Sequence, residues 1–96
     1  MSPEVTVRFT GELRRLAGQG SLQLSLEKGA ILEDAVIVAG ELMSPAFRNE
    51  VVEPLLEGKP AAPLLLLNRT LRSRAELDQL LSEGDIVAFV QPMEGG

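Results

Sequence analysis

The stretch VTVRFTGELRRLAGQGSLQLSLE, residues 5–27, decides the fold because it holds two runs of alternating character. Apolar side chains take every second position in each run, first Val5, Val7 and Phe9 and then Leu22, Leu24 and Leu26. Such alternation is typical of strands with one buried face. Three glycines lie between the runs, so we expect an antiparallel pair joined by a longish loop in which Leu13 and Leu16 turn inward.

The next segment, GAILEDAVIVAGELM at residues 29–43, has the period of an amphipathic helix. Its apolar face is expected to hold most of the aliphatic side chains: Ile31, Leu32, Ala35, Val36, Val38, Ala39, Leu42 and Met43. Gly29 is only a fair N-cap, and Gly40 should weaken the last turns by about 1 kcal/mol relative to alanine. Ile37 falls on the polar face, where it is either a lone exposed apolar side chain or part of a partner contact.

A second, short helix is expected from SPAFRNEVVEPLL, residues 44–56. Ser44 can cap it, Pro45 suits its first position, and Pro54 should end or bend it. The run LLLLN, residues 64–68, is short and continuously apolar. Such a run favours a strand that is buried on both faces.

Two more elements follow before the C-terminus. The sequence SRAE at residues 73–76 is a capping box and predicts a helix of one or two turns. IVAFVQ, residues 86–91, predicts the last strand, which Pro92 should end because proline cannot donate to a ladder. The order is therefore strand, strand, helix, short helix, strand, short helix, strand. That order indicates an α+β fold, with a mixed sheet and one main helix packed on a face.

The composition limits the chemistry that the chain offers. Its 96 residues suit one domain, and the absence of cysteine and histidine removes thiol catalysis, imidazole general bases and the usual zinc sites. The 14 acidic residues are scattered, and their spacing selects no catalytic pair. The net charge of −5 argues against a nucleic-acid partner. No segment reads as a membrane span or a signal peptide, so we expect a cytoplasmic protein without a membrane partner.

Two loose sets of basic residues, Arg14–Arg15 and Arg69–Arg72–Arg74, leave two interpretations open. They are either solvated charges on loops or a docking contact for an acidic partner. The sequence alone favours the first, because charged side chains are mostly exposed in any fold.

The sequence VQPMEGG, residues 90–96, closes the chain on a glycine pair. Glycine lacks a Cβ atom and accepts any backbone conformation, so the pair can pass down a narrow channel into another protein's active site. Its α-carboxylate becomes reactive once it is joined to AMP, which is a good leaving group. Gly96 would then be a covalent carrier and not a catalyst. The alternative is a non-covalent binding domain with an idle tail.

The segments VRFTGELRRLAG, LLLLN and EGDIVAFVQPMEGG resemble the MoaD/ThiS family of sulfur carriers, and the resemblance covers nearly the whole chain. It implies a β-grasp, ubiquitin-like fold, with residues 1–91 as the domain and residues 92–96 as a flexible C-terminal tail. It also implies that an E1-like enzyme adenylates Gly96 with ATP and Mg²⁺, and that sulfur transfer then gives a thiocarboxylate. The carrier itself binds no cofactor or metal. The tail inserted into the partner's active site comprises Pro92, Met93, Glu94, Gly95 and Gly96.

The first of these segments, VRFTGELRRLAG, is closest to the small subunit of molybdopterin synthase. This implies a large-subunit partner and sulfur donation for the molybdenum cofactor, by a carrier subunit that is not catalytic on its own. The alternatives are a ubiquitin-like protein modifier or a carrier for thiamine, the tungsten cofactor or tRNA thiolation. The chain departs from the family pattern after its last two predicted strands, with Asn68-Arg69 in place of Asn-Gly and Gln91-Pro92 in place of two prolines.

Overall fold

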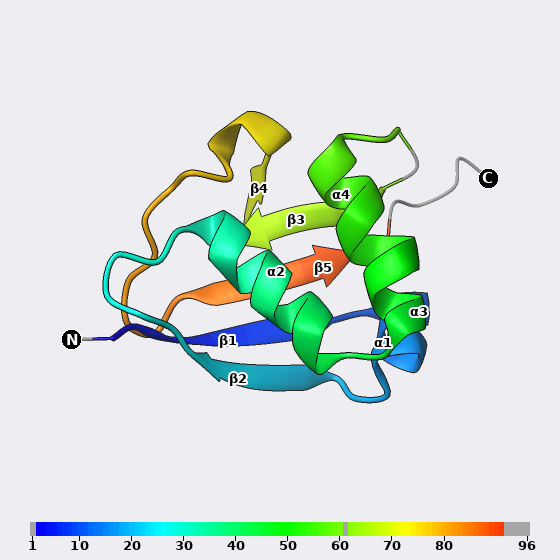
Figure 1. Cartoon of the computed structure of the whole chain (residues 1–96), viewed down its shortest axis with the longest axis horizontal. Coiled ribbons are helices and arrows are strands. Elements are labelled where there is room, and N and C mark those ends of the chain that lie inside the picture. The colour runs from blue at the N-terminus through cyan, green and yellow to red at the C-terminus, as the bar shows by residue number, and fades with distance from the viewer. Residues whose placement is uncertain (1, 61, 92–96) are drawn as a thin grey trace.

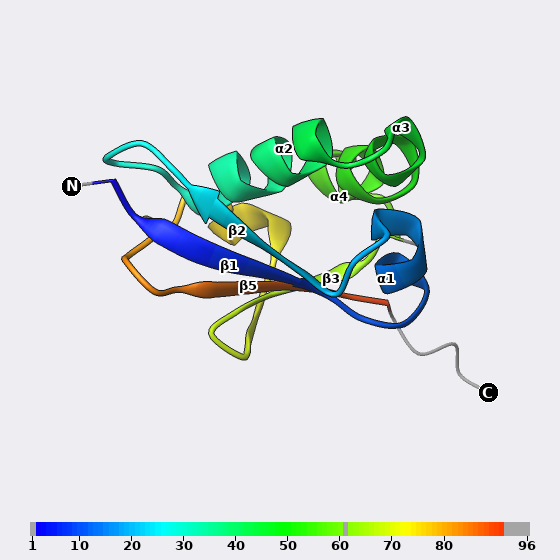
Figure 2. The ribbon, with the colours of Figure 1, turned by 90° about the horizontal axis from the view of Figure 1, so that it is seen from below.

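The structure, a computed structural model, describes residues 2–60 and 62–91. Five strands form one mixed sheet in the order β2-β1-β5-β3-β4. The helices of the described part all lie against one face of this sheet and leave the other face open (Figure 2). The strands are β1 (Glu4–Phe9), β2 (Ser21–Ser25), β3 (Leu64–Leu67), β4 (Thr70–Arg72) and β5 (Ile86–Val90), and the helices are α1 (Gly11–Ala17), α2 (Leu32–Leu42), α3 (Pro45–Phe47) and α4 (Glu53–Glu57). The predicted α+β architecture is confirmed.

The first two strands pair as the alternating runs predicted. β1 and β2 are antiparallel, with Val5 opposite Leu24 and Val7 opposite Leu22, and their apolar side chains face the helices. The connection is not a loop, as the glycines suggested, but contains helix α1. Burial of Leu13 explains this difference, because one apolar anchor is enough to hold a two-turn helix against the sheet. Gly18 then ends α1 in the left-handed conformation, at φ +77°.

The main helix, α2, lies across the sheet (Figure 1) and buries four residues of the predicted apolar face, Leu32, Ala35, Val36 and Ala39. It begins after Ile31 rather than at Gly29, because the Asp34 carboxylate accepts a hydrogen bond from the Ile31 N–H at 2.8 Å. Leu42 was expected on the buried face but is 59% exposed. Gly40 permits a close approach, since a Cβ atom there would lie 3.0 Å from Val52.

The second helical segment runs from Pro45 to Glu57, close to the predicted residues 44–56. The Ser44 hydroxyl accepts from the Phe47 N–H at 3.2 Å and caps α3 as expected. The helix was expected to end or bend at Pro54, but the chain continues through a π-helical stretch, Arg48–Val52, into α4 and ends only at Gly58. Pro54 is tolerated because it falls in the first turn of α4, directly after the change from π-helix to α-helix.

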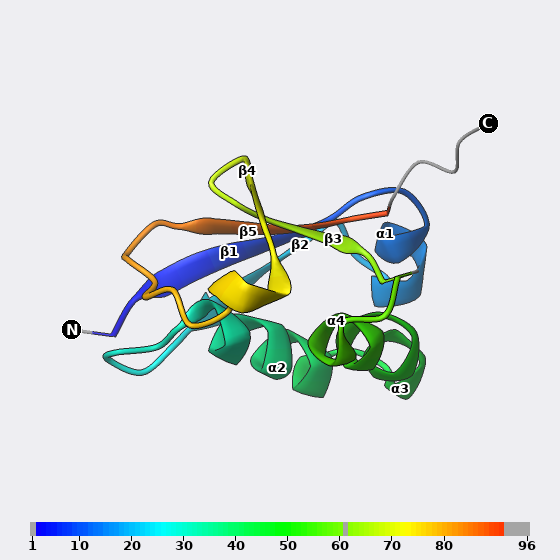
Figure 3. The same cartoon turned by 90° about the horizontal axis from the view of Figure 1, so that it is seen from above.

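The third strand is buried on one face only, which corrects the expectation of two buried faces. Leu65 and Leu67 are buried, whereas Leu64 is 39% exposed, because no helix of the described chain covers the other side of the sheet. Strand β4 was missed altogether. It follows β3 through a tight turn in which Asn68 and Arg69 have positive φ, 51° and 73°. Figure 3 shows this hairpin projecting from the side of the sheet opposite the helices.

The centre of the core is formed by the three phenylalanines of the chain. Phe9 on β1, Phe89 on β5 and Phe47 on α3 bring their ring centroids to within 5.2–5.8 Å of one another. All three side chains are buried, and among the described residues the fully buried side chains are apolar. The rings therefore join the middle of the sheet to the second helical segment.

Candidate functional site

The sequence places the candidate modification site at Gly96 and its neighbours, and these residues, 92–96, lie outside the described part of the chain. The strand that precedes them is well anchored. β5 pairs in parallel with β1 and in antiparallel with β3, so it occupies the middle of the sheet. Val87 and Phe89 are fully buried, and the Thr10 hydroxyl donates to the Phe89 carbonyl at 3.3 Å. The fold therefore holds the chain firmly up to Val90.

A polar network fixes the other end of β5 to the hairpin turn. The Asn68 side-chain amide donates to Asp85 at 2.9 Å, and its carbonyl accepts from the Ile86 N–H at 2.9 Å. The Asn68 N–H in turn donates to the Ile86 carbonyl at 2.8 Å. Asp85 also accepts from the Ser82 N–H at 2.7 Å, which closes the turn before β5. This role of Asn68 was not predicted, although an asparagine after an apolar run is a recognisable turn signal.

The open side of the sheet carries an apolar face that continues to the end of β5. Leu66 lies directly opposite both Ala88 and Leu71, and Leu64 lies opposite Val90. Leu71 is 57% exposed. We define the apolar face by the side chains on this side of β3, β4 and β5: Leu64, Leu66, Leu71, Ile86, Ala88 and Val90. Contiguous exposed apolar surface marks an interaction site more often than a scattered residue does.

The basic residues make contacts within the chain at three of the predicted positions. Arg15 pairs with Glu12 at 2.6 Å, and the Arg74 Nε donates to the Leu56 carbonyl at 2.8 Å. Arg72 pairs with Glu76 at 2.9 Å. Arg72 and Arg74 therefore hold the chain's own structure together, and Arg15 is a solvated charge on α1, as the first of the two interpretations expected of charges outside the core.

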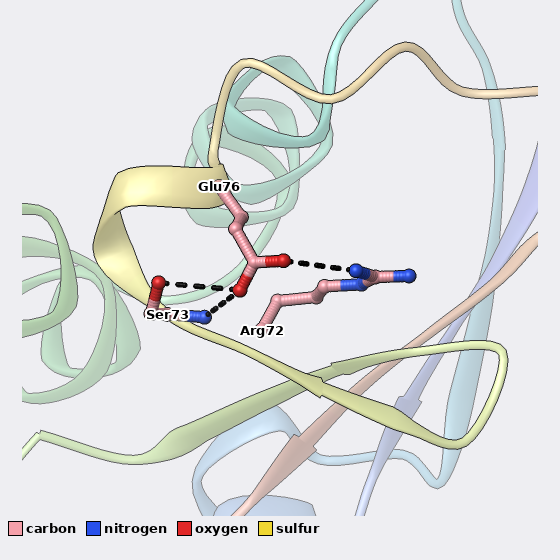
Figure 4. Close-up of polar contacts among 3 residues, drawn as sticks. All are labelled: Arg72, Ser73 and Glu76. Atoms are coloured by element: carbon pink, nitrogen blue, oxygen red, sulfur yellow. Dashed lines mark hydrogen bonds and ion pairs between the residues drawn. The ribbon is translucent and has the colours of Figure 1, made fainter.

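The capping box predicted at residues 73–76 is present (Figure 4). The Glu76 carboxylate accepts from the Ser73 N–H at 2.9 Å and from the Ser73 hydroxyl at 3.2 Å. The pKa of Glu76 is lowered from its ordinary value, first by the hydrogen bond from the Ser73 backbone and then by the guanidinium of Arg72. The capping box begins a single turn, Arg74–Glu76, as short as the one- or two-turn helix that was expected, and this turn is of the 3₁₀ type. Of the leucines that follow the turn, Leu77 and Leu81 are buried and Leu80 is 65% exposed.

Replacing Glu76 with glutamine is expected to lower the thermal unfolding midpoint at neutral pH. The difference from the unchanged protein should shrink as the pH falls through the lowered pKa of Glu76, because a carboxylate with a depressed pKa in the folded state contributes stability only while it is ionised. Thermal unfolding of both proteins over an acid-to-neutral pH series measures this. If the difference between the two unfolding midpoints stayed constant down to acid pH, the loss of stability would come from a change in side-chain shape and not from the loss of the charge.

Two structural findings bear on the kind of site. Within residues 2–60 and 62–91, the acidic side chains form no group of three or more that could hold a metal ion. In the same residues, the helices are too short and too polar to cross a bilayer.

Comparison with known proteins finds relatives at the levels of sequence and structure, although no model of a known family matches the chain. The chain is 32% identical over 76 residues to an uncharacterized protein from Archaeoglobus fulgidus, in an alignment that covers 79% of this chain and 77% of that protein.

Solved structures extend the likeness over nearly the whole chain. One is a Pyrococcus furiosus protein assigned as molybdopterin converting factor subunit 1, with a TM-score of 0.75 and 26% identity over 96% of this chain and 100% of that one. Another is the small archaeal modifier protein 1 of Methanosarcina acetivorans, with a TM-score of 0.71 and 23% identity over 100% and 99%. A chain of the Helicobacter pylori complex of subunits 1 and 2 of molybdopterin-converting factor has a TM-score of 0.61 and 20% identity over 97% and 99%.

Proposed function

Because the chain belongs to the MoaD/ThiS family of β-grasp, ubiquitin-like sulfur carriers, we propose that Gly96 carries sulfur as a thiocarboxylate for molybdopterin synthesis. The Gly96 carboxylate attacks the α-phosphorus of ATP, held with Mg²⁺ by an E1-like enzyme, and releases pyrophosphate. Sulfide then attacks the glycyl carbonyl carbon and displaces AMP, which gives the thiocarboxylate. The thiocarboxylate sulfur attacks a pterin precursor on a large-subunit partner and forms a C–S bond, and water then cleaves the acyl–sulfur bond and restores the carboxylate. We place these sulfur-transfer steps in the cytoplasm.

This proposal rests mainly on one observation: the last strand, β5, is held in the sheet on both sides, and its final residue belongs to the apolar face. β5 is fixed on both sides by hydrogen-bonded neighbours up to Val90, and Val90 itself belongs to the apolar face. A partner that covers this face therefore has the residues that follow Val90 directly at its surface. Since glycine adds no side chain, Gly95 and Gly96 suit a narrow channel in that partner. The apolar face supplies binding and the glycine pair supplies the reactive end.

The large-subunit partner is proposed by analogy with the Helicobacter pylori complex, in which a chain of similar fold lies with a second subunit. Leu71 and Leu64 are the most exposed leucines of the apolar face, and β-sheet faces of this kind bind by excluding water from a shared apolar contact. The chain's own cations at Arg15, Arg72 and Arg74 already have partners, so the contact rests mainly on the leucines.

The proposal is tested by intact-mass spectrometry of the protein after incubation with its E1-like enzyme, Mg-ATP and a sulfide source. We expect a mass gain equal to the exchange of one oxygen for sulfur, located at Gly96 by fragmentation. Without the sulfur source, the glycyl adenylate should accumulate instead. If Gly96 gains neither AMP nor sulfur with any cognate activating enzyme, the carrier function is refuted. Transfer of the sulfur to a pterin precursor by a large subunit then tests the molybdopterin route against other acceptors.

A second candidate is a ubiquitin-like protein modifier, which the likeness to the archaeal modifier protein favours. It requires the same adenylate but a lysine amine as the final acceptor, so that an amide forms at Gly96 and AMP leaves. Covalent conjugates of higher mass in cells, absent when Gly96 is deleted, would support this function. Thiocarboxylate without conjugates would support the sulfur carrier.

A further inference from the structure

One edge of the sheet lacks the features that normally protect an edge strand. β2 pairs only with β1, and Figure 1 shows it along the lower rim of the molecule with no described element beyond it. Proteins usually protect edges with short strands, lysines, prolines or bulges, because unpaired N–H and C=O groups recruit other strands. The opposite edge, β4, has only three residues. β2 has five residues, SLQLS, and none of them is charged or a proline.

The unpaired backbone groups of β2 belong to alternate residues. The Phe9 N–H donates to the Gly20 carbonyl at 3.0 Å, and the Leu26 N–H donates to the Pro3 carbonyl at 2.9 Å, so both Gly20 and Leu26 face β1. Since successive residues of a strand direct their polar groups to opposite sides, every second residue between them faces the free edge. The residues that present N–H and C=O to a newcomer are Ser21, Gln23 and Ser25.

The sequence of this edge reads the same in both directions about Gln23. We propose that two copies of the chain pair through β2, antiparallel, about a two-fold axis at Gln23. In this register Gln23 faces its own copy, and Ser21 faces Ser25 of the second copy on either side. All of these residues present their polar groups to the edge, so each opposed pair exchanges two backbone hydrogen bonds. Moving the axis by one residue, to Leu22 or Leu24, would also oppose outward-facing residues, but it would pair serine with glutamine and leave one end of the strand unmatched. The palindrome therefore selects Gln23 among the registers that the hydrogen-bond pattern allows.

The side chains along this register are complementary. On the open side of the sheet the Gln23 amide, which both donates and accepts, meets an identical amide. On the helix side Leu22 meets Leu24 of the second copy, and cross-strand apolar pairs stabilise a sheet. Leu42 is an apolar side chain on the same flank of α2 as Val38, which lines a hollow with Ser25 of β2, and it is 59% exposed. A second copy covers the side chain that the monomer leaves exposed.

Charge does not oppose the pairing, although the chain carries a net charge of −5. The strand itself is neutral, so no like charges meet across the join. Continued beyond the strand, the register places Glu27 opposite Gln19 of the second copy. Gln19 lines a hollow together with Arg14, so at each end of the contact an acidic side chain lies near a basic one. The apolar face on β3, β4 and β5 stays free, and the dimer leaves the proposed partner contact open.

Sedimentation velocity over protein concentrations from about 1 μM to about 1 mM tests the dimer. The unchanged chain should shift from its monomer mass of 10.3 kDa to twice that mass. Gln23→Lys and Gln23→Glu should each weaken association at least about tenfold, because like charges then face one another across the axis. An equimolar mixture of these two variants should regain the doubled mass, since the axis now pairs lysine with glutamate.

Two controls make the result specific to β2. Thr70→Lys places the same charge on the other edge strand, and it should leave the association unchanged. Amide hydrogen exchange should show protection of Ser21, Gln23 and Ser25 that rises with protein concentration, while Leu22 and Leu24 are protected at all concentrations by β1. An unchanged chain that stays at 10.3 kDa throughout, or a dimer that Thr70→Lys disperses and the Gln23 variants do not, overturns the proposal.

Discussion

Truncation of Phe89 to alanine is expected to lower the free energy of unfolding by about 3–5 kcal/mol, which is a large share of the roughly 5–15 kcal/mol that holds a typical domain together. Phe89 is fully buried in the central strand and packs on two rings, with centroid distances of 5.8 Å to Phe9 and 5.7 Å to Phe47. Its loss therefore leaves a cavity bordered by β1 and α3 together, which cannot collapse by moving one element. Urea denaturation followed by far-UV circular dichroism measures the effect.

Leu80→Ala is the matched control for this variant, because Leu80 is 65% exposed and packs on little. Its effect should stay within about 0.5 kcal/mol. A Phe89→Ala protein that unfolds at the same urea concentration as Leu80→Ala would contradict the three-ring core. In the absence of urea, where Phe89→Ala remains folded, the variant should still be modified at Gly96. The side chain of residue 89 lies on the face of β5 opposite the apolar face, so its loss does not touch the proposed partner contact.

Much of the fold follows from periodicity, because alternation and helical spacing report directly which face of an element is buried. The pattern from Val5 to Leu26 identified β1 and β2 with the correct facing, and Ser44 identified the start of α3. Periodicity cannot tell which face of an element is buried where a run is uniformly apolar. Four leucines in succession, Leu64–Leu67, say nothing about the number of covered faces, which depends on where the helices lie.

The elements that the sequence did not predict are short or depend on distant contacts. β4 spans Thr70–Arg72 and exists because Asn68 and Arg69 adopt positive φ and return the chain along β3. A two-residue turn of this type usually shows Asn-Gly, so the arginine concealed it. The prediction of the candidate site was incomplete for the same reason. Without β4, Leu71 had no strand to place it beside Leu66, and the apolar face stayed hidden.

The interpretation of the glycine pair came from chemistry and not from periodicity, and it predicts the largest functional loss.

Deletion of Gly96 should slow adenylation, and with it thiocarboxylation, at least about 100-fold. The carboxylate would then lie one residue, about 3.5 Å, short of the activating site. Its fold should be unaffected, since the described structure is held by contacts that end at Val90. Single-turnover formation of the adenylate, followed by mass spectrometry, measures the loss. Deletion of the exposed Ser2 shortens the chain equally at the other end and should cost nothing.

A second variant separates the reactive end from the surface that delivers it. Leu71→Glu places a charge at the β4 edge of the apolar face, beside Leu66, on a side chain that is already 57% exposed, so the fold should tolerate it. The activating enzyme must also receive the residues that follow Val90, so we expect it to cover the same face as the large subunit. Buried apolar anchors account for most of the energy of an interface, and its affinity for Leu71→Glu should therefore fall at least about tenfold. At saturating enzyme the variant should still gain AMP at Gly96, whereas the Gly96 deletion should bind normally and gain none. If Leu71→Glu bound as tightly as the unchanged chain, the activating enzyme would have to dock elsewhere; if the deletion were still activated, Gly96 would not be the reactive residue.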